Sequence, residues 1–288
     1  MRRTRVTRRD MTRSISPVIT AAELAAIIDN DDLRIVDASW WMDNRDARAD
    51  FEKAHITGAV FIDIDAVSDN ASPLPHTLPQ AAAFAATAGA AGIGRDDHIV
   101  VYDTQGLFSA ARMWWLFRVF GAQRVQVLDG GLPKWQADGH PVEIGKAAPR
   151  DSVAFDASFN AKAVANTNDV LAALGTDTQI IDARSAPRFN AQAPEPRAGV
   201  RGGHMPGALN LPFGHLLNAD GTIKGGPALE AAFKEIGVDF DRPVITSCGS
   251  GVTAAILTLG LELLGKPSRL SDVSWTEWGS REDTPIEP

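Results

Sequence analysis

The sequence of 288 residues contains a single cysteine, Cys248. One thiol cannot form an intramolecular disulfide, and it excludes every zinc site that needs two or more thiolates. We expect that the protein needs no metal and no other cofactor. A chain without disulfides fits a reducing compartment best, and we therefore expect a cytoplasmic protein.

The sequence also lacks a long hydrophobic run. Its longest apolar stretches, residues 113–120 and 252–264, contain Arg118 and Glu262 and fall short of the roughly 20 residues that cross a bilayer, so no membrane partner is expected. The N-terminus lacks the apolar core of a secretory signal. Its Arg and Thr content resembles an organellar transit peptide, but we favour a disordered Arg-rich tail over residues 1–16.

Positive charge is scarce outside that tail. The whole chain has a formal charge of −8, although residues 1–13 hold six Arg and one Asp. Without them the chain has 22 basic and 35 acidic residues, a net charge of −13. A body of that charge repels polyanions, so nucleic acids are not expected as partners.

An internal repeat organises the chain. RIVDASW from residue 34 is echoed by IIDARS from residue 180, and IVVYDTQGLFSAA from residue 99 by PVITSCGSGVTAA from residue 243. HITGAVFIDID and LDGGLPKW have later counterparts in the same order, HMPGALNLPF and LSDVSWTEW. Asp103 then aligns with Cys248 at an offset of 145 residues, and two homologous domains follow.

Each copy reads as a small α/β unit. Short β-branched runs such as 99–102, 125–128, 179–182 and 244–246 alternate with helical patterns over 78–88 and 252–264. Strands that are apolar throughout and separated by helices predict a parallel sheet with helices on both faces. We expect domains at residues 17–140 and 166–288, joined by a linker over residues 141–165.

Cys248 follows a predicted strand and precedes a predicted helix. Such strand ends carry the ligand sites of parallel α/β sheets. The sequence Cys-Gly-Ser-Gly-Val-Thr from residue 248 allows a tight turn whose N–H groups point inward, next to the positive end of the helix. That setting lowers a thiol pKa, so Cys248 is the candidate nucleophile.

Cysteine-dependent phosphatases use a similar loop, with an Arg six positions after the Cys. Here that position is Ala254, and residues 248–253 include no basic side chain. Phosphoryl transfer would lack its main charge stabiliser. The backbone of Gly249, Gly251, Val252 and Thr253 suits a persulfide anion better, so sulfur transfer is the favoured chemistry.

These residues resemble the tandem-domain rhodanese family. The duplication, CGSGVTA at 248–254, LFSAARMWW at 107–115, PEPR at 194–197 and SWTEW at 274–278 carry the resemblance. The branch that uses thiosulfate typically has Cys-Arg-Lys-Gly-Val-Thr, whereas the mercaptopyruvate-using branch has the loop found here. The resemblance implies a rhodanese fold for both domains and a non-catalytic N-terminal domain, and Asp103 in place of a cysteine agrees.

The segment 184–204 holds four Arg among Pro and Gly, which indicates a loop. A keto acid needs planar, bidentate recognition of its carboxylate, which Arg supplies well. The resemblance implies that Arg188 and Arg197 bind the substrate, while we expect Arg184 and Arg201 to form structural ion pairs. A solvated surface loop is the alternative.

Cleavage of a carbon–sulfur bond leaves an enolate that needs a proton. Ser250 lies in the loop itself, and the resemblance brings in His55 from the other domain as acid or relay. We expect Asp46 to orient His55, with Asp43 as a competitor. His204, the repeat counterpart of His55, stands for the structural alternative.

The resemblance thus implies that 3-mercaptopyruvate donates sulfur to Cys248 and that cyanide or a thiol such as thioredoxin accepts it. Three alternatives remain: thiosulfate as donor, a phosphatase, and a non-catalytic sulfur-binding or scaffold module. We expect a monomer or weak dimer. The chain departs from the family at Ser271 and Val273, where Tyr and Gly are usual, which leaves the acceptor preference open.

Overall fold

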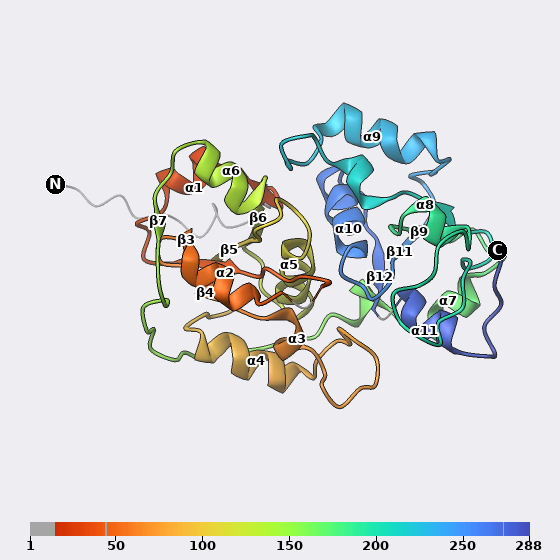
Figure 1. Ribbon diagram of the computed structural model, residues 1–288, viewed down its shortest axis with the longest axis horizontal. Coiled ribbons are helices and arrows are strands. Elements are labelled where there is room, and N and C mark those ends of the chain that lie inside the picture. Colours follow the sequence, from red (N-terminus) through yellow and green to blue (C-terminus); the bar gives the residue numbers. More distant parts are fainter. Residues whose placement is uncertain (1–14, 44, 273) are drawn as a thin grey trace.

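The computed structural model describes residues 15–43, 45–272 and 274–288. Nearly all of the expected tail, residues 1–14, and Val273 therefore lie outside the described residues. Figure 1 shows two α/β halves side by side, the first coloured red to green and the second green to blue. The predicted fold class, two parallel sheets flanked by helices, is confirmed.

The N-terminal half contains a five-stranded parallel sheet of order β1-β6-β5-β2-β4, and a small antiparallel pair, β3 with β7. Its strands are β1 Val18–Ile19, β2 Leu33–Asp37, β3 His55–Ile56, β4 Val60–Phe61, β5 His98–Tyr102, β6 Val125–Leu128 and β7 Val142–Glu143. Its helices are α1 Ala21–Ala26, α2 Ala47–Lys53, α3 Ile64–Val67, α4 Ala81–Ala90, α5 Ala110–Val119 and α6 Gly131–Ala137.

The C-terminal half repeats this sheet in the order β10-β9-β11-β12-β8. Its strands are β8 Val164–Ala165, β9 Gln179–Asp182, β10 Leu209–Asn210, β11 Val244–Ser247 and β12 Arg269–Ser271. Its helices are α7 Thr167–Ala173, α8 Ala186–Phe189, α9 Gly226–Glu235, α10 Ala254–Leu263 and α11 Ser274–Ser280, with 3-10 turns at Ala161–Ala163 and Phe213–Leu216.

The two sheets correspond strand for strand when the second order is read in reverse, and β5 and β11 each occupy the central position. The chain leaves β5 at Asp103 and leaves β11 at Cys248, so both residues lie beyond the carboxyl end of a central strand. The apolar faces explain the layers. In the N-terminal half Leu24 of α1 and Trp135 of α6 cover one face, and Phe84 of α4 covers the other.

Two helix boundaries differ from the sequence expectation. Helix α4 begins at Ala81 and not at residue 78, because Pro79 disfavours the helical conformation for Leu78. Helix α10 begins at Ala254, which leaves Val252 and Thr253 in the loop after Cys248. Outside the helix, the Leu78 N–H donates to Asp272 across the domain junction at 2.7 Å.

The expected linker is partly structured. Its first residues form β7, which pairs with β3, and its last residues form β8, the edge strand of the second sheet. Phe155 in its middle is buried against Phe84 and Phe117. The segment therefore packs on the N-terminal half before it enters the C-terminal sheet. No helix in the described part of the chain is long and apolar enough to cross a membrane.

The two halves share one apolar cluster, which runs through the facing helices α5 and α10 (Figure 1). Two ion pairs cross the same junction from α5. The Arg112 guanidinium is buried and donates to Asp272 at 2.6 Å, whereas Arg118 pairs with Glu262 at 2.9 Å with both side chains more than one-third exposed. Arg112 also donates to the His76 carbonyl at 2.7 Å. The buried pair therefore joins three segments.

We expect Arg112→Ala to lower the free energy of unfolding by about 3 to 5 kcal/mol, because it strands the buried Asp272 carboxylate. The matched variant Arg118→Ala removes a half-exposed pair from the same helix and should cost less than about 1 kcal/mol. Urea denaturation followed by tryptophan fluorescence measures both. Equal losses in the two variants would contradict this assignment.

Candidate active site

Cys248 lies at the base of a tight loop between β11 and α10. The side chain is 2% exposed, and its Sγ accepts a hydrogen bond from the Gly251 N–H at 3.1 Å. The Cys248 N–H donates to Ser274 Oγ at 3.1 Å, and its carbonyl accepts from the Trp275 N–H at 2.9 Å. The start of α11 therefore fixes the backbone of Cys248, while the Gly251 N–H of the loop faces the sulfur.

The two glycines of the loop are required for different reasons. Gly251 has φ +80°, and a Cβ there would collide with the Asp272 carbonyl oxygen and lie 2.9 Å from Arg112 Nη1. Gly249 has no such strain, and a Cβ there would meet only the end of the Arg188 side chain at 3.1 Å. Gly251 therefore shapes the cradle, and Gly249 leaves room for a guanidinium.

A serine, a histidine and an aspartate form a chain beside the loop. His76 Nδ1 lies 2.8 Å from Ser250 Oγ, and His76 Nε2 lies 2.9 Å from Asp65 Oδ1. The hydrogen bond from His76 lowers the pKa of Asp65, so its carboxylate stays ionised. An ionised carboxylate only accepts, which places a proton on His76 Nε2 and leaves Nδ1 free to accept from Ser250.

Two guanidinium groups lie at the cavity: Arg188 comes from α8, and Arg197 comes from the loop that follows α8. Arg188 pairs with Glu195 at 2.5 Å, and both Arg188 and Arg197 line the cavity next to Cys248. Burial lowers the pKa of Arg197, and the neighbouring Arg188 cation lowers it further. A half-buried cation beside another cation favours an anion between them, which fits a carboxylate ligand.

The remaining two arginines of the segment are structural. Arg184 is fully buried and pairs with Asp182 at 2.8 Å and Glu195 at 2.9 Å, as expected. Arg201 differs from the expectation of an ion pair, because within the described residues its guanidinium donates to backbone carbonyls, including those of Gly279 and Arg281, and to the Thr284 hydroxyl.

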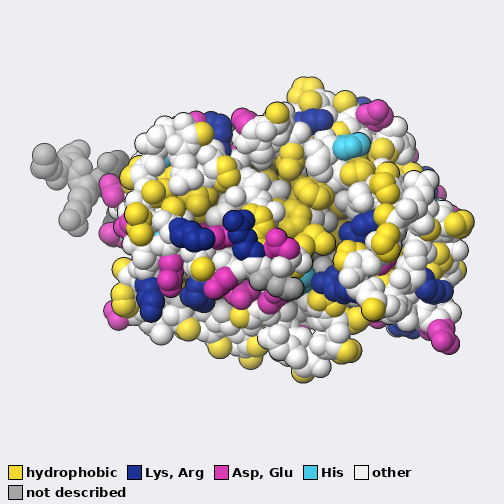
Figure 2. Space-filling model, viewed as in Figure 1, with side chains coloured by type: hydrophobic (Ala, Val, Ile, Leu, Met, Phe, Trp, Pro, Cys, Tyr) yellow, Lys and Arg dark blue, Asp and Glu magenta, His cyan; other side chains and the backbone are white. Residues whose placement is uncertain are grey.

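These groups enclose a cavity of about 160 Å³. Its wall combines the loop and the arginines with apolar side chains of both halves: Trp40, Met42, Phe108, Pro196, Phe213 and Val252. Figure 2 shows hydrophobic side chains gathered on the face where the two halves meet, with basic side chains beside them. The size and the lining suit a small anion that carries a short carbon skeleton.

His55 and Asp46 are not brought to this cavity, which corrects the sequence expectation. The buried His55 ring stacks on Phe51, its Nδ1 lies 2.9 Å from the Phe51 carbonyl, and its Nε2 lies 3.5 Å from Glu143. Asp46 caps α2 by accepting from the Ala49 N–H. The competitor Asp43 accepts from the Arg45 N–H in the same exposed turn.

The internal repeat distinguishes a structural histidine, His55, from the site histidine, His76. His204 stacks on Phe189 and faces Glu287 in the same way that His55 stacks on Phe51 and faces Glu143. A histidine with the same environment in both halves is structural. His76 has no such counterpart, because the residues 145 to 149 positions later, 221–225, include no histidine.

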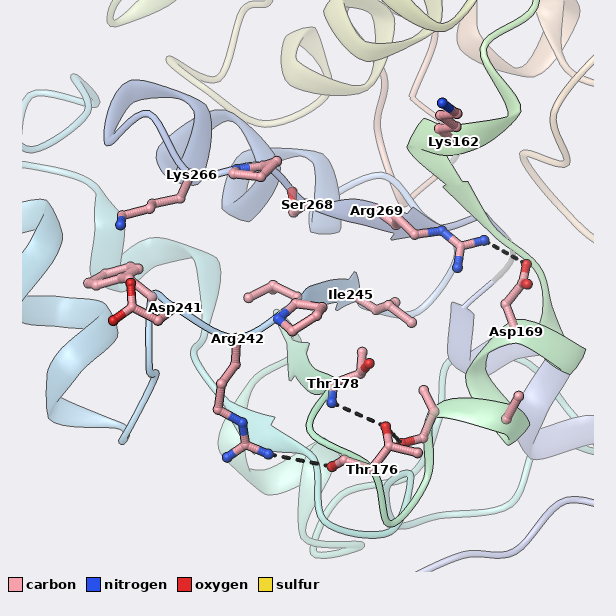
Figure 3. Close-up of a pocket in the computed structure, with 16 residues that line it drawn as sticks. Lys162, Asp169, Thr176, Thr178, Asp241, Arg242, Ile245, Lys266, Ser268 and Arg269 are labelled. Carbon is pink, nitrogen blue, oxygen red and sulfur yellow. Dashed lines mark hydrogen bonds and ion pairs between the residues drawn. The ribbon is translucent and has the colours of Figure 1, made fainter.

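A larger cavity of about 720 Å³ lies at the opposite, amino end of the C-terminal sheet (Figure 3). Its arginines are engaged: Arg269 pairs with Asp169 at 2.8 Å, and Arg242 donates to the Thr176 carbonyl. No cysteine or histidine lines it. Among the described residues there is no cluster of His, Cys, Asp or Glu suited to a metal ion. The chemistry therefore belongs to the smaller cavity.

The glycine pair gives a direct test of the cradle. We expect Gly251→Ala to slow alkylation of Cys248 at pH 7 by about 100-fold, because the strained Cβ displaces the N–H that faces Sγ. Gly249→Ala should change that rate by less than about threefold, since only a flexible arginine must move. Iodoacetamide kinetics measured by intact mass decide this, and similar rates in both variants would count against the cradle.

Known proteins that are similar to this chain agree with the geometry of the site. The rhodanese-like domain model matches residues 20–138 and 166–281. The chain is 47% identical over 270 residues to the 3-mercaptopyruvate sulfurtransferase of Escherichia coli strain K12, and this match covers 92% of this chain and 95% of the relative. It is 40% identical over 255 residues to the thiosulfate sulfurtransferase of Bos taurus, with 86% of each covered.

Among solved structures, the crystal structure of SseA from Escherichia coli, described as a 3-mercaptopyruvate sulfotransferase, matches with a TM-score of 0.84. The identity is 42%, and the match covers 91% of this chain and 99% of that one. Sequence, fold and site therefore lead to one conclusion: the chain belongs to the rhodanese family and carries two rhodanese-like domains in tandem.

Proposed function

We propose that this protein is a sulfurtransferase that takes sulfur from 3-mercaptopyruvate onto Cys248 and passes it to a thiol or to cyanide. One observation carries the proposal: a cradled thiol shares a small cavity with two guanidinium groups and a Ser250–His76–Asp65 chain. The N-terminal domain performs no sulfur chemistry of its own in this proposal, since Asp103 replaces the nucleophile.

The arginines select an acid with a neighbouring carbonyl. The ion pair with Glu195 fixes the orientation of the Arg188 guanidinium. Arg197 is half-buried and lines the same cavity. Together they bind the carboxylate and keto oxygens of the donor and place its thiol carbon toward Cys248. The apolar wall of Trp40 and Phe108 accommodates the methylene group.

The first step forms one bond and breaks one. The Cys248 thiolate attacks the donor sulfur, the sulfur–sulfur bond forms, and the carbon–sulfur bond breaks with its electron pair left on carbon as the pyruvate enolate. The sulfur of Cys248 is oxidised and the donor carbon is reduced, so no external electron acceptor is needed. The Gly251 N–H, with the other N–H groups of the loop, stabilises the persulfide anion.

The enolate then needs a proton. Ser250 takes the proton of the donor thiol while its own proton passes to His76 Nδ1, and ionised Asp65 stabilises the imidazolium that forms. The relay then runs in reverse, and Ser250 delivers the proton to the enolate carbon. The proton lost by the donor thiol balances the proton gained by pyruvate. A second step transfers the outer sulfur to a thiol such as thioredoxin or to cyanide and regenerates the Cys248 thiolate.

Thiosulfate is the competing donor within the same family. The loop favours 3-mercaptopyruvate, because residues 248–253 carry no cation for a dianion. The relatives include both a 3-mercaptopyruvate sulfurtransferase and a thiosulfate sulfurtransferase, so the preference between donors is the point to measure. A phosphatase is disfavoured because the six-residue loop is followed by Ala254.

The test is the intact mass of the wild-type protein and of Cys248→Ser after brief exposure to either donor, with pyruvate assayed in parallel. We expect one added sulfur on the wild type only, with pyruvate released and with 3-mercaptopyruvate reacting at least about tenfold faster than thiosulfate.

A faster reaction with thiosulfate would assign the protein to the other branch of donors. No adduct from either donor would overturn the proposal and favour the non-catalytic module. An adduct on Cys248→Ser would show a different nucleophile and would overturn the assignment of the reaction to Cys248.

A further inference from the structure

The N-terminal half contains a second copy of the cradle, and a carboxylate fills it. Asp103 is fully buried beyond β5, at the position that Cys248 holds beyond β11. Its Oδ2 accepts from the N–H groups of Phe108 at 2.7 Å and Ala110 at 2.9 Å, and its Oδ1 accepts from the Gln105 N–H at 2.9 Å. Three backbone donors therefore converge on one side chain.

The ionised form of Asp103 matches this arrangement. Burial raises the pKa of Asp103, and the backbone N–H groups of Ala110, Phe108 and Gln105 oppose that shift. The three groups that hydrogen-bond to the carboxyl oxygens are all N–H donors, so a protonated oxygen would face an N–H group that cannot accept its proton. The loop 103–110 is thus closed around an anion.

The carboxylate oxygen reaches one atom further than a thiolate. From Cα, the order in aspartate is Cβ, Cγ and Oδ, and in a cysteine persulfide it is Cβ, Sγ and the outer sulfur. In the C-terminal loop, one backbone N–H of the described residues bonds to Sγ, whereas three bond to Asp103. The carboxylate oxygen of Asp103 therefore lies as many covalent bonds from Cα as the outer sulfur of the persulfide that Cys248 would carry after sulfur transfer.

The closed loop contributes directly to the substrate cavity. Phe108, whose N–H bonds to Asp103, lines the cavity next to Cys248. Its ring stacks on Trp40 with centroids 6.2 Å apart and meets Phe213 of the C-terminal half edge-on at 5.5 Å. Gly106 of the same loop lies close to Gly221 across the junction. A Cβ added at Gly106 would lie 3.3 Å from the Gly221 Cα.

We propose that Asp103 is a positioning residue for the sulfurtransferase site. As the acceptor of three backbone N–H groups in the first cradle it holds the loop 103–110 closed and so fixes Phe108 in the wall of the cavity beside Cys248. The non-catalytic domain keeps its cradle because the loop that the cradle closes has become part of the other domain's cavity. This inference rests on the proposed function for its kinetic consequence, but its structural part does not.

The first test is Asp103→Asn. An amide offers one oxygen and one NH₂ group, so whichever way it lies an NH₂ group faces a backbone N–H. We expect the amides of residues 105–110 to exchange hydrogen at least about tenfold faster, and KM for 3-mercaptopyruvate to rise about tenfold with kcat nearly unchanged. Hydrogen exchange by mass spectrometry and steady-state kinetics measure the two effects.

A double-mutant cycle separates positioning from general damage. Phe108→Ala alone should raise KM by a similar factor, and adding Asp103→Asn to it should raise KM by less than about twofold more. His98→Gln perturbs the other end of β5, where His98 bonds to Gln126, and should leave KM within about twofold of the wild type.

An unchanged exchange rate or an unchanged KM in Asp103→Asn would overturn the inference, and so would additive effects in the cycle. If Asp103→Asn does not fold, Ser39→Ala replaces it, because Ser39 Oγ accepts from the Thr104 N–H of the same loop and carries no charge. If the wild type takes no sulfur from any donor, the proposed function fails, while the exchange experiment still decides the role of Asp103.

Discussion

The buried ion pair between Arg112 and Asp272 is the constraint on which the rest of the site depends. Arg112 belongs to α5 of the first half and Asp272 follows β12 of the second, and the same guanidinium binds the carbonyl of His76. Asp272 in turn accepts from the Leu78 N–H. Breaking such a pair strands a charge, so the two halves have one favourable register, and that register sets His76 against Ser250.

The two halves have diverged around a shared geometry. Both central strands end in a loop whose N–H groups point inward, and the first loop holds a carboxylate where the second holds a thiol. A fixed anion makes the first loop a structural wall, whereas a thiol leaves the second loop able to gain and lose sulfur. The duplication thus supplies one reactive cradle and one scaffold that shapes the cavity above it.

The sequence predicts the parts of this arrangement that are local. The repeat, the strand ends, the glycines around Cys248 and the arginines of the 184–204 loop all follow from short-range patterns. His76 and Asp65 do not, because His76 lies in an irregular loop without periodicity and meets Ser250, 174 residues away, only after the domains dock. His55 is a more prominent candidate from the resemblance, but its environment recurs at His204, which indicates a structural role.

A single turnover of His76→Asn with each donor tests the role of the Ser250–His76–Asp65 chain most directly. Asparagine tolerates the φ of +57° at this position, so the loop can keep its shape. Pyruvate release from 3-mercaptopyruvate should slow by about 100-fold, because the enolate loses its proton source, while sulfur transfer from thiosulfate, whose sulfite leaving group needs no proton on carbon, should change by less than about threefold. Equal slowing with both donors, or no slowing with either, would contradict a role for His76 in protonating the enolate.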